Sequence, residues 1–219
     1  MSKKDSLSVI VPIQKETRRL PLVILDIDKR LSDAGYKSEI IVVTSGNVGK
    51  TAEIVKNMSK TLRNLKILEN DEDNGIGQAI RQGMLLGSGK FKLFTSPDNS
   101  ISVHHFNHML PYFKKGADIV LGSRTFEGGF LNRVKYINSW TLKNASGLIF
   151  KPLIPRGVTD THCQFKAFTD SAAEEIFTPL KSTSKHFHIE VLRHIKSRNY
   201  SIAEIPVQVS VFKYNHAPK

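Results

Sequence analysis

Two charged side chains, Asp98 and Arg124, each follow a short apolar segment of the chain. Asp98 lies in the polar segment Thr95-Ser-Pro-Asp-Asn99, where a carboxylate with little bulk around it can hold a divalent metal that bridges a diphosphate. Arg124 ends the segment Gly122-Ser-Arg124, and its planar guanidinium suits bidentate capture of phosphate oxygens. The pair predicts a site for a phosphorylated ligand. The alternative is an ordinary turn and a surface arginine.

The segment Thr44-Ser-Gly-Asn-Val-Gly-Lys-Thr51 differs at one position from the phosphate-binding loop G-x-x-x-x-G-K-[ST]. Lys50 and Thr51 stand where such a loop binds phosphate and Mg²⁺. Thr44, however, replaces the first glycine, which supplies a permissive backbone. We therefore favour a plain strand-to-helix turn.

Three histidines, His104, His105 and His108, fall on one predicted helix, and positions 104 and 108 share a face of it. This spacing permits metal binding, but no acidic or cysteine ligand lies nearby in the sequence, so we favour a solvated helix face. The single cysteine, Cys163, rules out an internal disulfide and fits a reducing compartment. We interpret it as a small buried residue.

Short apolar segments alternate with helical patterns along much of the chain. We expect strands at 7–11, 39–43, 65–68, 91–94, 118–121 and 202–212. We expect helices at 16–33, 51–61, 77–86, 102–115, 130–150, 171–177 and 187–198. This alternation predicts an α/β fold with parallel strands, in which ligands bind beyond the carboxyl ends of the strands.

The chain has 219 residues, of which 40% are hydrophobic and 24% charged, which is ordinary globular composition. Its 32 lysines and arginines against 20 aspartates and glutamates give a net charge of +12, which favours anionic partners such as nucleic acid, acidic lipid or a phosphorylated small molecule. No run of about 18 apolar residues occurs, and the polar start does not resemble a signal peptide. We expect one cytoplasmic domain over residues 1–219, with flexible ends at 1–6 and 213–219.

Taken together, these segments resemble the family-2 glycosyltransferases of the GT-A fold, and among them the dolichyl- or polyprenyl-phosphate mannosyl- and glucosyltransferases. The most specific element is Asp160-Thr-His-Cys-Gln-Phe-Lys166-Ala-Phe168, which is similar to the D-T-Q-C-G-F-K-x-F signature of that branch. The other matching segments are Ser8-Val-Ile-Val-Pro12 with Glu16, Glu39-Ile-Ile-Val-Val43, 75–83, Leu93-Phe94 with Asp98, Gly122-Ser-Arg124, Phe187-His-Ile-Glu190 and Ala203-Glu-Ile-Pro-Val207.

The resemblance implies a GT-A fold, with a mostly parallel central sheet and helices on both faces. It implies transfer of a hexose, with inversion, from a nucleotide diphospho-sugar to a polyprenyl or dolichyl phosphate. Asp98 would hold Mg²⁺ or Mn²⁺, and Asp98 and Arg124 would be the catalytic residues. The residues expected to bind the nucleotide-sugar are Pro12, Gln14, Glu16, Thr44, Gly75, Gln78, Lys166 and Glu190.

The sequence departs from the family's motifs at several strand ends. The paired aspartates of D-D-G-S, one of which usually contacts the base, are Thr44 and Ser45 here, and the first aspartate of D-x-D is Ser96. The aspartate before the matching glutamate of the F-D-x-E element is His188. Two alternatives follow: an active glycosyltransferase with altered donor choice, or a catalytically impaired relative that acts as a binding or regulatory subunit. A nucleic-acid-binding or phosphate-loop protein is a third hypothesis, which these motifs disfavour.

A lipid-phosphate acceptor would bring the protein to a membrane. The basic, aromatic segment 126–150, which contains Tyr136 and Trp140, predicts a helix lying on the cytoplasmic membrane face. An amphipathic helix packed on the domain is the alternative, and a membrane subunit is another way to reach the lipid.

Overall fold

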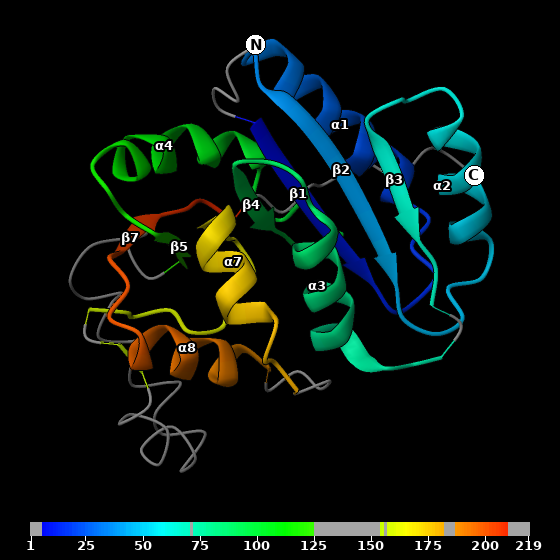
Figure 1. Ribbon diagram of the computed structural model, residues 1–219. Helices are drawn as coiled ribbons and strands as arrows, with labels where there is room; N and C mark the ends of the chain where they lie inside the picture. Colours follow the sequence, from blue (N-terminus) through cyan, green and yellow to red (C-terminus); the bar gives the residue numbers. More distant parts are fainter. Residues whose placement is uncertain (1–5, 71, 125–153, 156, 182–186, 210–219) are drawn as a thin grey trace.

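The computed structural model describes residues 6–70, 72–124, 154–155, 157–181 and 187–209, which form a central sheet between two layers of helices (Figure 1). The strands are β1 (Ser6–Ile13), β2 (Lys37–Thr44), β3 (Leu65–Leu68), β4 (Phe91–Phe94), β5 (Ile119–Ser123), β6 (Lys166–Thr169) and β7 (Ile202–Pro206). The helices are α1 (Leu20–Asp33), α2 (Lys50–Ser59), α3 (Gly75–Leu86), the 3-10 turn η1 (Val103–His105), α4 (Phe106–Lys114), α7 (Asp170–Phe177) and α8 (Phe187–Ser197). The predicted helix at 130–150 and the predicted end at 213–219 lie outside the described residues.

One seven-stranded sheet joins the strands in the order β3-β2-β1-β4-β6-β5-β7. Every neighbouring pair is parallel except those of β6, which runs antiparallel to both β4 and β5. The predicted, mostly parallel sheet is therefore confirmed. Because β1 pairs with β2 on one side and with β4 on the other, the carboxyl ends of these three strands lie side by side.

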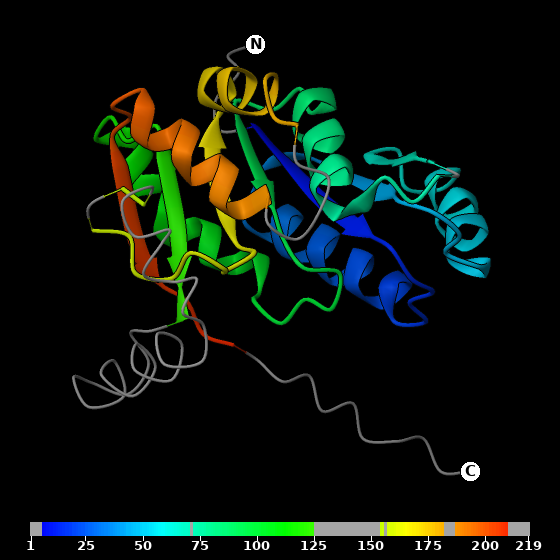
Figure 2. The ribbon, with the colours of Figure 1, turned by 90° about the horizontal axis from the view of Figure 1, so that it is seen from below.

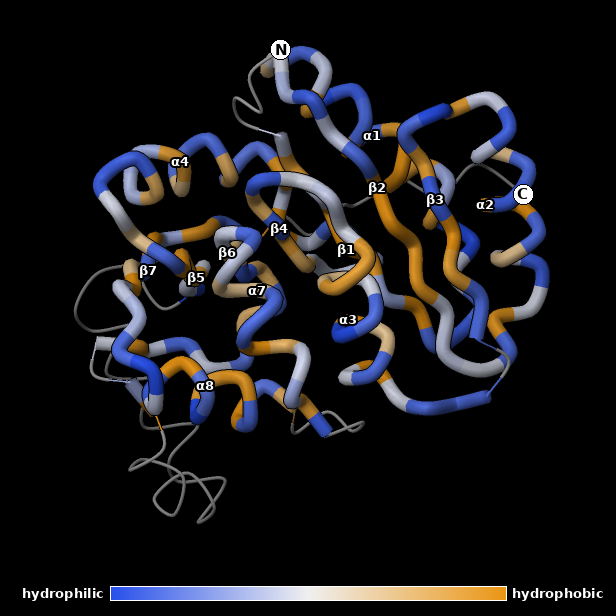
Figure 3. Tube along the Cα trace, in the orientation of Figure 1, coloured by the Kyte–Doolittle hydropathy of each residue, from blue (hydrophilic) through white to orange (hydrophobic). Residues whose placement is uncertain are grey.

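Each face of the sheet carries its own apolar core, because successive side chains of a strand point to opposite faces. Val9 and Val11 of β1 belong to the core beneath α1 and α4, whereas Ile10 belongs to the core beneath α3, α7 and α8. The view in Figure 2 separates these two helical layers on either side of the sheet. Figure 3 shows the apolar residues that run along β2 and β3. Helices on both faces were predicted, and this is confirmed.

Helix α3 lies against the sheet at Gly83. A Cβ atom at this position would stand 2.5 Å from Cγ2 of Ile10 and 3.0 Å from Cγ2 of Val43. Only glycine lets the backbone of α3 approach these side chains of the sheet so closely. The contact fixes the position of α3, whose first turn follows β3 at the edge where the strands end.

Strand β1 continues through Pro12, where the sequence predicted its end. Ile10 O accepts a hydrogen bond from Thr95 N, and β4 has already ended at Phe94. The N–H that Pro12 lacks would point beyond the last residue of β4, so the proline costs no ladder hydrogen bond. Helix α1 begins at Leu20 instead of residue 16, with Pro21 in its first turn, where a missing N–H costs nothing.

Three further differences concern the second half of the chain and its start. The strand β6 was not predicted. β7 ends at Pro206, whereas the strand was predicted to continue to residue 212. Of that continuation the structure describes residues 207–209, in which Val209 forms an isolated antiparallel bridge with Ile101. Ser6, which was predicted to belong to a flexible end, begins β1. No helix in the described ranges has both the length and the apolar character needed to cross a bilayer.

Candidate active site at the carboxyl ends of the strands

Asp98 lies in the loop after β4 and is oriented by its own loop. Its Oδ1 accepts hydrogen bonds from Ser96 Oγ at 2.6 Å and from Ser100 N at 2.9 Å. Partial burial raises the pKa of this carboxyl, but the hydrogen bonds from Ser96 and Ser100 outweigh burial, and the pKa lies below its ordinary value. Asp98 is therefore an ionised carboxylate with a fixed direction.

A cavity of about 240 Å³, which we call the Arg124 cavity, lies between Asp98, the end of β5 and the start of the antiparallel β6. It is lined by Thr95, Ser96, Asp98, Ser100, Ile101, Arg124, His162, Gln164 and Val209. The structure thus brings the two predicted catalytic residues, Asp98 and Arg124, to one cavity. Thr95 Oγ1 is buried at this cavity and has no hydrogen-bond partner within the described part of the chain.

Arg124 is held by the buried carboxylate of Asp160. Arg124 Nε donates to Asp160 Oδ2 at 2.7 Å, and Nη2 donates to Oδ1 at 2.9 Å. Burial raises the pKa of Asp160, but the hydrogen bonds and charge of Arg124 outweigh burial and lower it. The bidentate pair fixes the plane of the guanidinium, and the carboxylate of Asp160 offsets its positive charge. Arg124 therefore acts at the cavity as an oriented set of donors more than as an isolated cation.

Asp160 is in turn positioned by Glu204 of β7. The two carboxylate oxygens of Glu204 accept hydrogen bonds from Thr159 N, Thr159 Oγ1 and Asp160 N at 2.8–3.1 Å. A carboxylate on β7 therefore holds the turn at 159–160, and this turn holds Arg124. The orientation of the Arg124 guanidinium therefore depends on two carboxylates: Asp160, which binds it directly, and Glu204, which holds Asp160 in place.

Lys166 lies beneath the cavity and is completely buried. Its Nζ donates to Thr161 O at 3.3 Å and also to Cys163 O, so it stabilises the turn that carries His162. Burial lowers the pKa of Lys166. The predicted contact of Lys166 with a nucleotide-sugar stays a prediction, since the side chain reaches the turn and not the cavity surface.

The ring of His188 is 5% exposed and packs on Phe187 and Phe94. Burial, with the charge of Lys166 in second place, lowers the pKa of His188 to about 2. A neutral imidazole therefore occupies the position where the family resemblance gave an aspartate.

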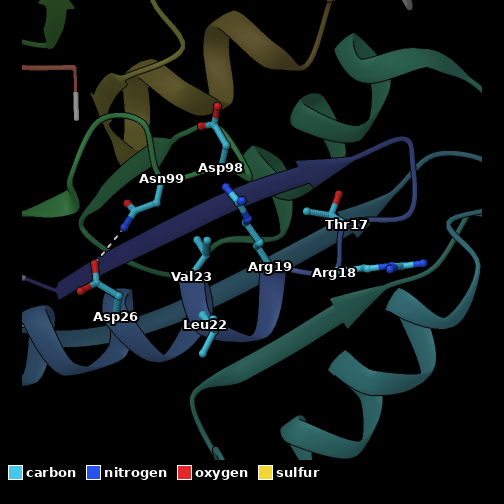
Figure 4. A pocket seen from close by; sticks show the side chains of 8 residues that line it. All are labelled: Thr17, Arg18, Arg19, Leu22, Val23, Asp26, Asp98 and Asn99. Carbon is cyan, nitrogen blue, oxygen red and sulfur yellow. Dashed lines mark hydrogen bonds between the residues drawn. The ribbon is translucent and has the colours of Figure 1, made fainter. Parts of the chain in front are cut away.

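A second cavity of about 300 Å³, which we call the Arg19 groove, lies on the α1 side of Asp98. Its lining consists of Thr17, Arg18, Arg19, Leu22, Val23, Asp26, Asp98 and Asn99. In Figure 4 Arg19 extends from the start of α1 toward the loop of Asp98, and Arg18 extends away from it. Asn99 Nδ2 donates to Asp26 Oδ2 at 2.8 Å and ties this loop to α1. Asp98 lines both cavities, so a ligand in either one would meet it.

Polar groups from β1, β2 and α3 meet around Asp73. Its Oδ1 accepts hydrogen bonds from Ser45 Oγ at 3.0 Å, Gly75 N at 3.2 Å and Gln14 Nε2 at 3.3 Å. These hydrogen bonds, that of Ser45 first, lower the pKa of the Asp73 carboxyl. Two predicted nucleotide-binding residues, Gln14 and Gly75, are thereby brought to one point beyond the ends of β1 and β2.

The remaining predicted nucleotide-binding residues of the first half lie around this cluster. Thr44 is buried, and its Oγ1 accepts a hydrogen bond from Asn70 N at 2.8 Å. Pro12 is buried within β1. Glu16 is exposed and lies over Gly49, where a Cβ atom would stand 2.8 Å from Glu16 Oε2. Direct contact of these three residues with a ligand stays a prediction.

Gln78 and Glu190 lie on helices that flank the site. Gln78 is in the first turn of α3 and is half-buried. Glu190 lies on α8, lines neither cavity, and its Oε1 accepts a hydrogen bond from Lys181 N at 3.1 Å. Their predicted roles in donor binding also stay predictions.

The histidines near residue 105 have a local structural role in the described fold. His105 Nε2 accepts a hydrogen bond from Gln208 N at 3.2 Å, and this ties the chain after β7 to η1. Within the described ranges, no group of three or more His, Cys, Asp or Glu side chains is arranged to hold a metal.

Asp98 fits a divalent metal in one particular mode. Mg²⁺ in phosphate sites is held by one or two carboxylates and by phosphate oxygens of the substrate, and it keeps several waters. Among the described residues that line the Arg124 cavity, Asp98 is the single carboxylate, and its low pKa keeps it ionised at neutral pH. The donor set therefore fits Mg²⁺ or Mn²⁺ when a diphosphate supplies the other ligands.

Three residues at this edge were not predicted to have these roles. Asp73 lies in the acidic segment between β3 and α3, to which the sequence analysis assigned no function. The one available signal was an acidic residue two positions before the glycine that begins α3. Asp160 and Glu204 stood inside matching motifs, without a partner assigned to either. Their pairings join positions 36 and 44 residues apart and have no signal in the local sequence.

Residues 8–177 match Glycosyl transferase family 2. The chain is 29% identical over 214 residues to dolichyl-phosphate beta-glucosyltransferase of Dictyostelium discoideum, a match that covers 92% of this chain and 65% of that protein. It is 30% identical over 214 residues to a protein of Trichomonas vaginalis with the same enzyme name, with 91% and 62% covered. The chain thus spans less than two thirds of the length of these two relatives.

Solved structures share the fold at low sequence identity. Glucosyl-3-phosphoglycerate synthase from Mycobacterium tuberculosis, in complex with Mn²⁺, uridine-diphosphate and phosphoglyceric acid, matches with a TM-score of 0.63 at 17% identity, covering 98% of this chain and 72% of that one. TarS of S. aureus matches with a TM-score of 0.55 at 19% identity, with 91% and 58% covered. These likenesses confirm the predicted GT-A fold.

Proposed function

The chain belongs to glycosyl transferase family 2, and we propose that it transfers a hexose from a nucleotide diphospho-sugar to a polyprenyl or dolichyl phosphate, with inversion. The observation that carries the proposal is the position of Asp98. It is an oriented, ionised carboxylate at the carboxyl end of β4 that lines both cavities and shares one of them with Arg124. A transferase must bring two substrates to one point, and Asp98 offers such a point.

The donor would lie across the ends of β2, β1 and β4, where ligands of open α/β sheets bind. We propose that its nucleotide contacts the loops after β1 and β2 and the start of α3. Its sugar would enter the Arg124 cavity, whose hydroxyl, amide and imidazole groups suit sugar hydroxyls. The proposed donor-binding residues are Pro12, Gln14, Glu16, Thr44, Gly75, Gln78, Lys166 and Glu190, Lys166 through the turn that it stabilises.

Asp98 would hold Mg²⁺ or Mn²⁺, which when bound neutralises charge on the departing diphosphate. Arg124, oriented by Asp160, donates hydrogen bonds to the same diphosphate oxygens as the bond from the sugar to the diphosphate breaks. A new bond forms from an acceptor phosphate oxygen to the anomeric carbon on the opposite side. A phosphate monoester has a second pKa of about 6, so this oxygen is largely deprotonated at neutral pH and needs no general base.

The acceptor places the reaction at a membrane surface. The relatives are named for dolichyl phosphate, and the net charge of +12 suits an anionic lipid headgroup. We propose a peripheral contact with the membrane. The segment 126–150, predicted to make that contact, lies outside the described residues.

A transfer assay tests the proposal. The purified chain is incubated with Mg²⁺, polyprenyl phosphate in detergent micelles and UDP-glucose, UDP-N-acetylglucosamine, GDP-mannose or dTDP-glucose in turn. We expect glycolipid from one donor, and a loss of at least about 100-fold in Asp98→Asn, because the metal ligand is removed. Asp33→Asn, an exposed aspartate at the end of α1 that lines neither cavity, is the matched control and should keep full activity. Absence of turnover with every donor would favour the catalytically impaired alternative.

A further inference from the structure

The chain after β7 reaches the Arg124 cavity as residues 207–209, which we call the strap. Val209 lines that cavity and forms an antiparallel bridge with Ile101, which lines the cavity as well. At the other end of the strap, Val207 N donates to Ser123 O at 3.0 Å, where β5 ends. The strap therefore contributes to a wall of the cavity, and its position affects the space within.

The middle residue of the strap depends on a histidine. Gln208 donates its backbone N–H to Nε2 of His105 at 3.2 Å. A backbone N–H can only donate, so Nε2 carries a lone pair, and the ring is neutral with its proton on Nδ1. Nδ1 is buried and has no hydrogen-bond partner in the described part of the chain. The neutral ring in this one tautomer is therefore the form that holds the strap.

The surroundings of His105 also favour the neutral ring. The titratable side chains that face it within the described ranges are His104 of the same 3-10 turn and His108 of α4, and no carboxylate is among them. Burial, followed by the charges of His108 and His104, lowers the pKa of His105 below its ordinary value. The ring of Phe165 packs edge-on against that of His105, with the centroids 6.3 Å apart. His105 is therefore neutral at neutral pH and becomes a cation only in acid.

We propose that His105 is a positioning residue that holds the strap at the Arg124 cavity, and that protonation of His105 releases the strap and weakens binding of the donor's sugar. This inference rests on the proposed function, which puts the sugar in that cavity. A proton on Nε2 points a second N–H at the N–H of Gln208, so the hydrogen bond is lost and two donors face each other. The strap is then held at its two ends without its middle contact.

Nuclear magnetic resonance of the full chain, without any ligand, tests the contact itself. The amide resonance of Gln208 should shift together with the ring resonances of His105 as the pH falls below about 6.5. His105→Gln should abolish the shift of the amide, because the side-chain oxygen accepts the same hydrogen bond and takes up no proton. His104→Gln is the matched control, an exposed neighbour in the same turn, and should keep the shift. A Gln208 amide that ignores pH in the wild type, or responds equally in His105→Gln, would overturn the proposal.

Equilibrium binding tests the consequence for the sugar. UDP-glucose, UDP-N-acetylglucosamine, GDP-mannose and dTDP-glucose are each compared with their own nucleoside diphosphate at one Mg²⁺ concentration. At neutral pH, His105→Phe, which keeps an aromatic ring but has no acceptor, should bind the preferred donor roughly 2- to 10-fold more weakly, the range for one neutral hydrogen bond, and the nucleoside diphosphate unchanged. In acid the wild type should approach His105→Phe, whereas His105→Gln should not. Titration of His162, which also lines the cavity, is common to all these proteins and cancels in the comparison.

The two measurements separate this inference from the function on which it rests. Equal losses of donor and nucleoside diphosphate in His105→Phe, or no loss of either, would overturn the role of the strap at the sugar. A wild type that binds none of the four donors would instead overturn the proposed function, and the effect on the sugar with it. The resonance of the Gln208 amide would still decide whether His105 holds the strap.

Discussion

Replacement of Asp160 by asparagine should destabilise the protein, because it removes the carboxylate that holds Arg124. The substitution keeps the size of the side chain but loses two charge-assisted hydrogen bonds of 2.7 and 2.9 Å. Loss of one partner of a buried ion pair costs about 3–5 kcal/mol. Since the Arg124 side chain is 31% exposed, water replaces part of the interaction, and we expect about 2–3 kcal/mol. For a chain of this length the Tm should fall by about 4–12 °C.

Thermal denaturation followed by circular dichroism at pH 7 measures this effect. Glu69→Gln is the matched control, because Lys56 and Glu69 form an ion pair of 3.2 Å whose side chains are 62% and 42% exposed, and such pairs contribute about 1 kcal/mol or less. In a chain that already carries Arg124→Met, Asp160→Asn should lower the Tm much less than it does in the wild type, because no cation is then left without its partner. A fall in Tm of less than about 2 °C, or equal falls in Asp160→Asn and Glu69→Gln, would refute the argument that this pair is a buried support of the site.

Two further predictions concern pH and stability. His188 has a folded pKa of about 2, so below pH 6.5 the unfolded chain binds a proton that the folded chain does not, and about 2 kcal/mol of unfolding free energy is lost between pH 6.5 and 5; urea titrations should show this loss in the wild type and a shallower slope in His188→Leu. Burial alone would raise the pKa of Glu39, but hydrogen bonds from Lys66, Ser8 and Ser88 lower it to about 2, so its contribution is present above pH 4.5 and is lost as the pH falls toward 2. Glu39→Gln should therefore lower the unfolding free energy by about 1–2 kcal/mol at pH 7, after allowance for solvent screening at the half-exposed Lys66, and by much less at pH 3; equal losses at both pH values would contradict this.

The strands with continuous apolar sequences could be predicted, because burial on both faces leaves a clear pattern. The segments 65–68 and 91–94 match β3 and β4 at both ends. β6 carries no such pattern: it has four residues and begins with Lys166, whose burial depends on backbone carbonyls of the preceding turn. Its antiparallel direction also breaks the strand–helix alternation on which the prediction rested.

The two predicted catalytic residues could be found because each lies shortly after a strand. Asp98 lies in the loop after β4, Arg124 directly follows β5, and the two line one cavity. The Asp160–Arg124 pair and the three donors to Asp73 depend on which loops lie side by side at the sheet edge. That information resides in the order of the strands, which local sequence does not encode.

The two serines at the altered motifs bear on whether the site has lost its chemistry. Ser45 and Ser96 stand where the resemblance gave aspartates, and each donates a hydrogen bond to an aspartate, Ser45 to Asp73 and Ser96 to Asp98. Two carboxylates at hydrogen-bonding distance repel, which raises the pKa of one of them, whereas a serine hydroxyl lowers the pKa of the single carboxylate and fixes its direction. Each serine therefore removes a second negative charge from the site and, in its place, orients the aspartate that remains. On this argument the altered motifs change how the carboxylates are supported and leave one ionised carboxylate at each end of the proposed donor site.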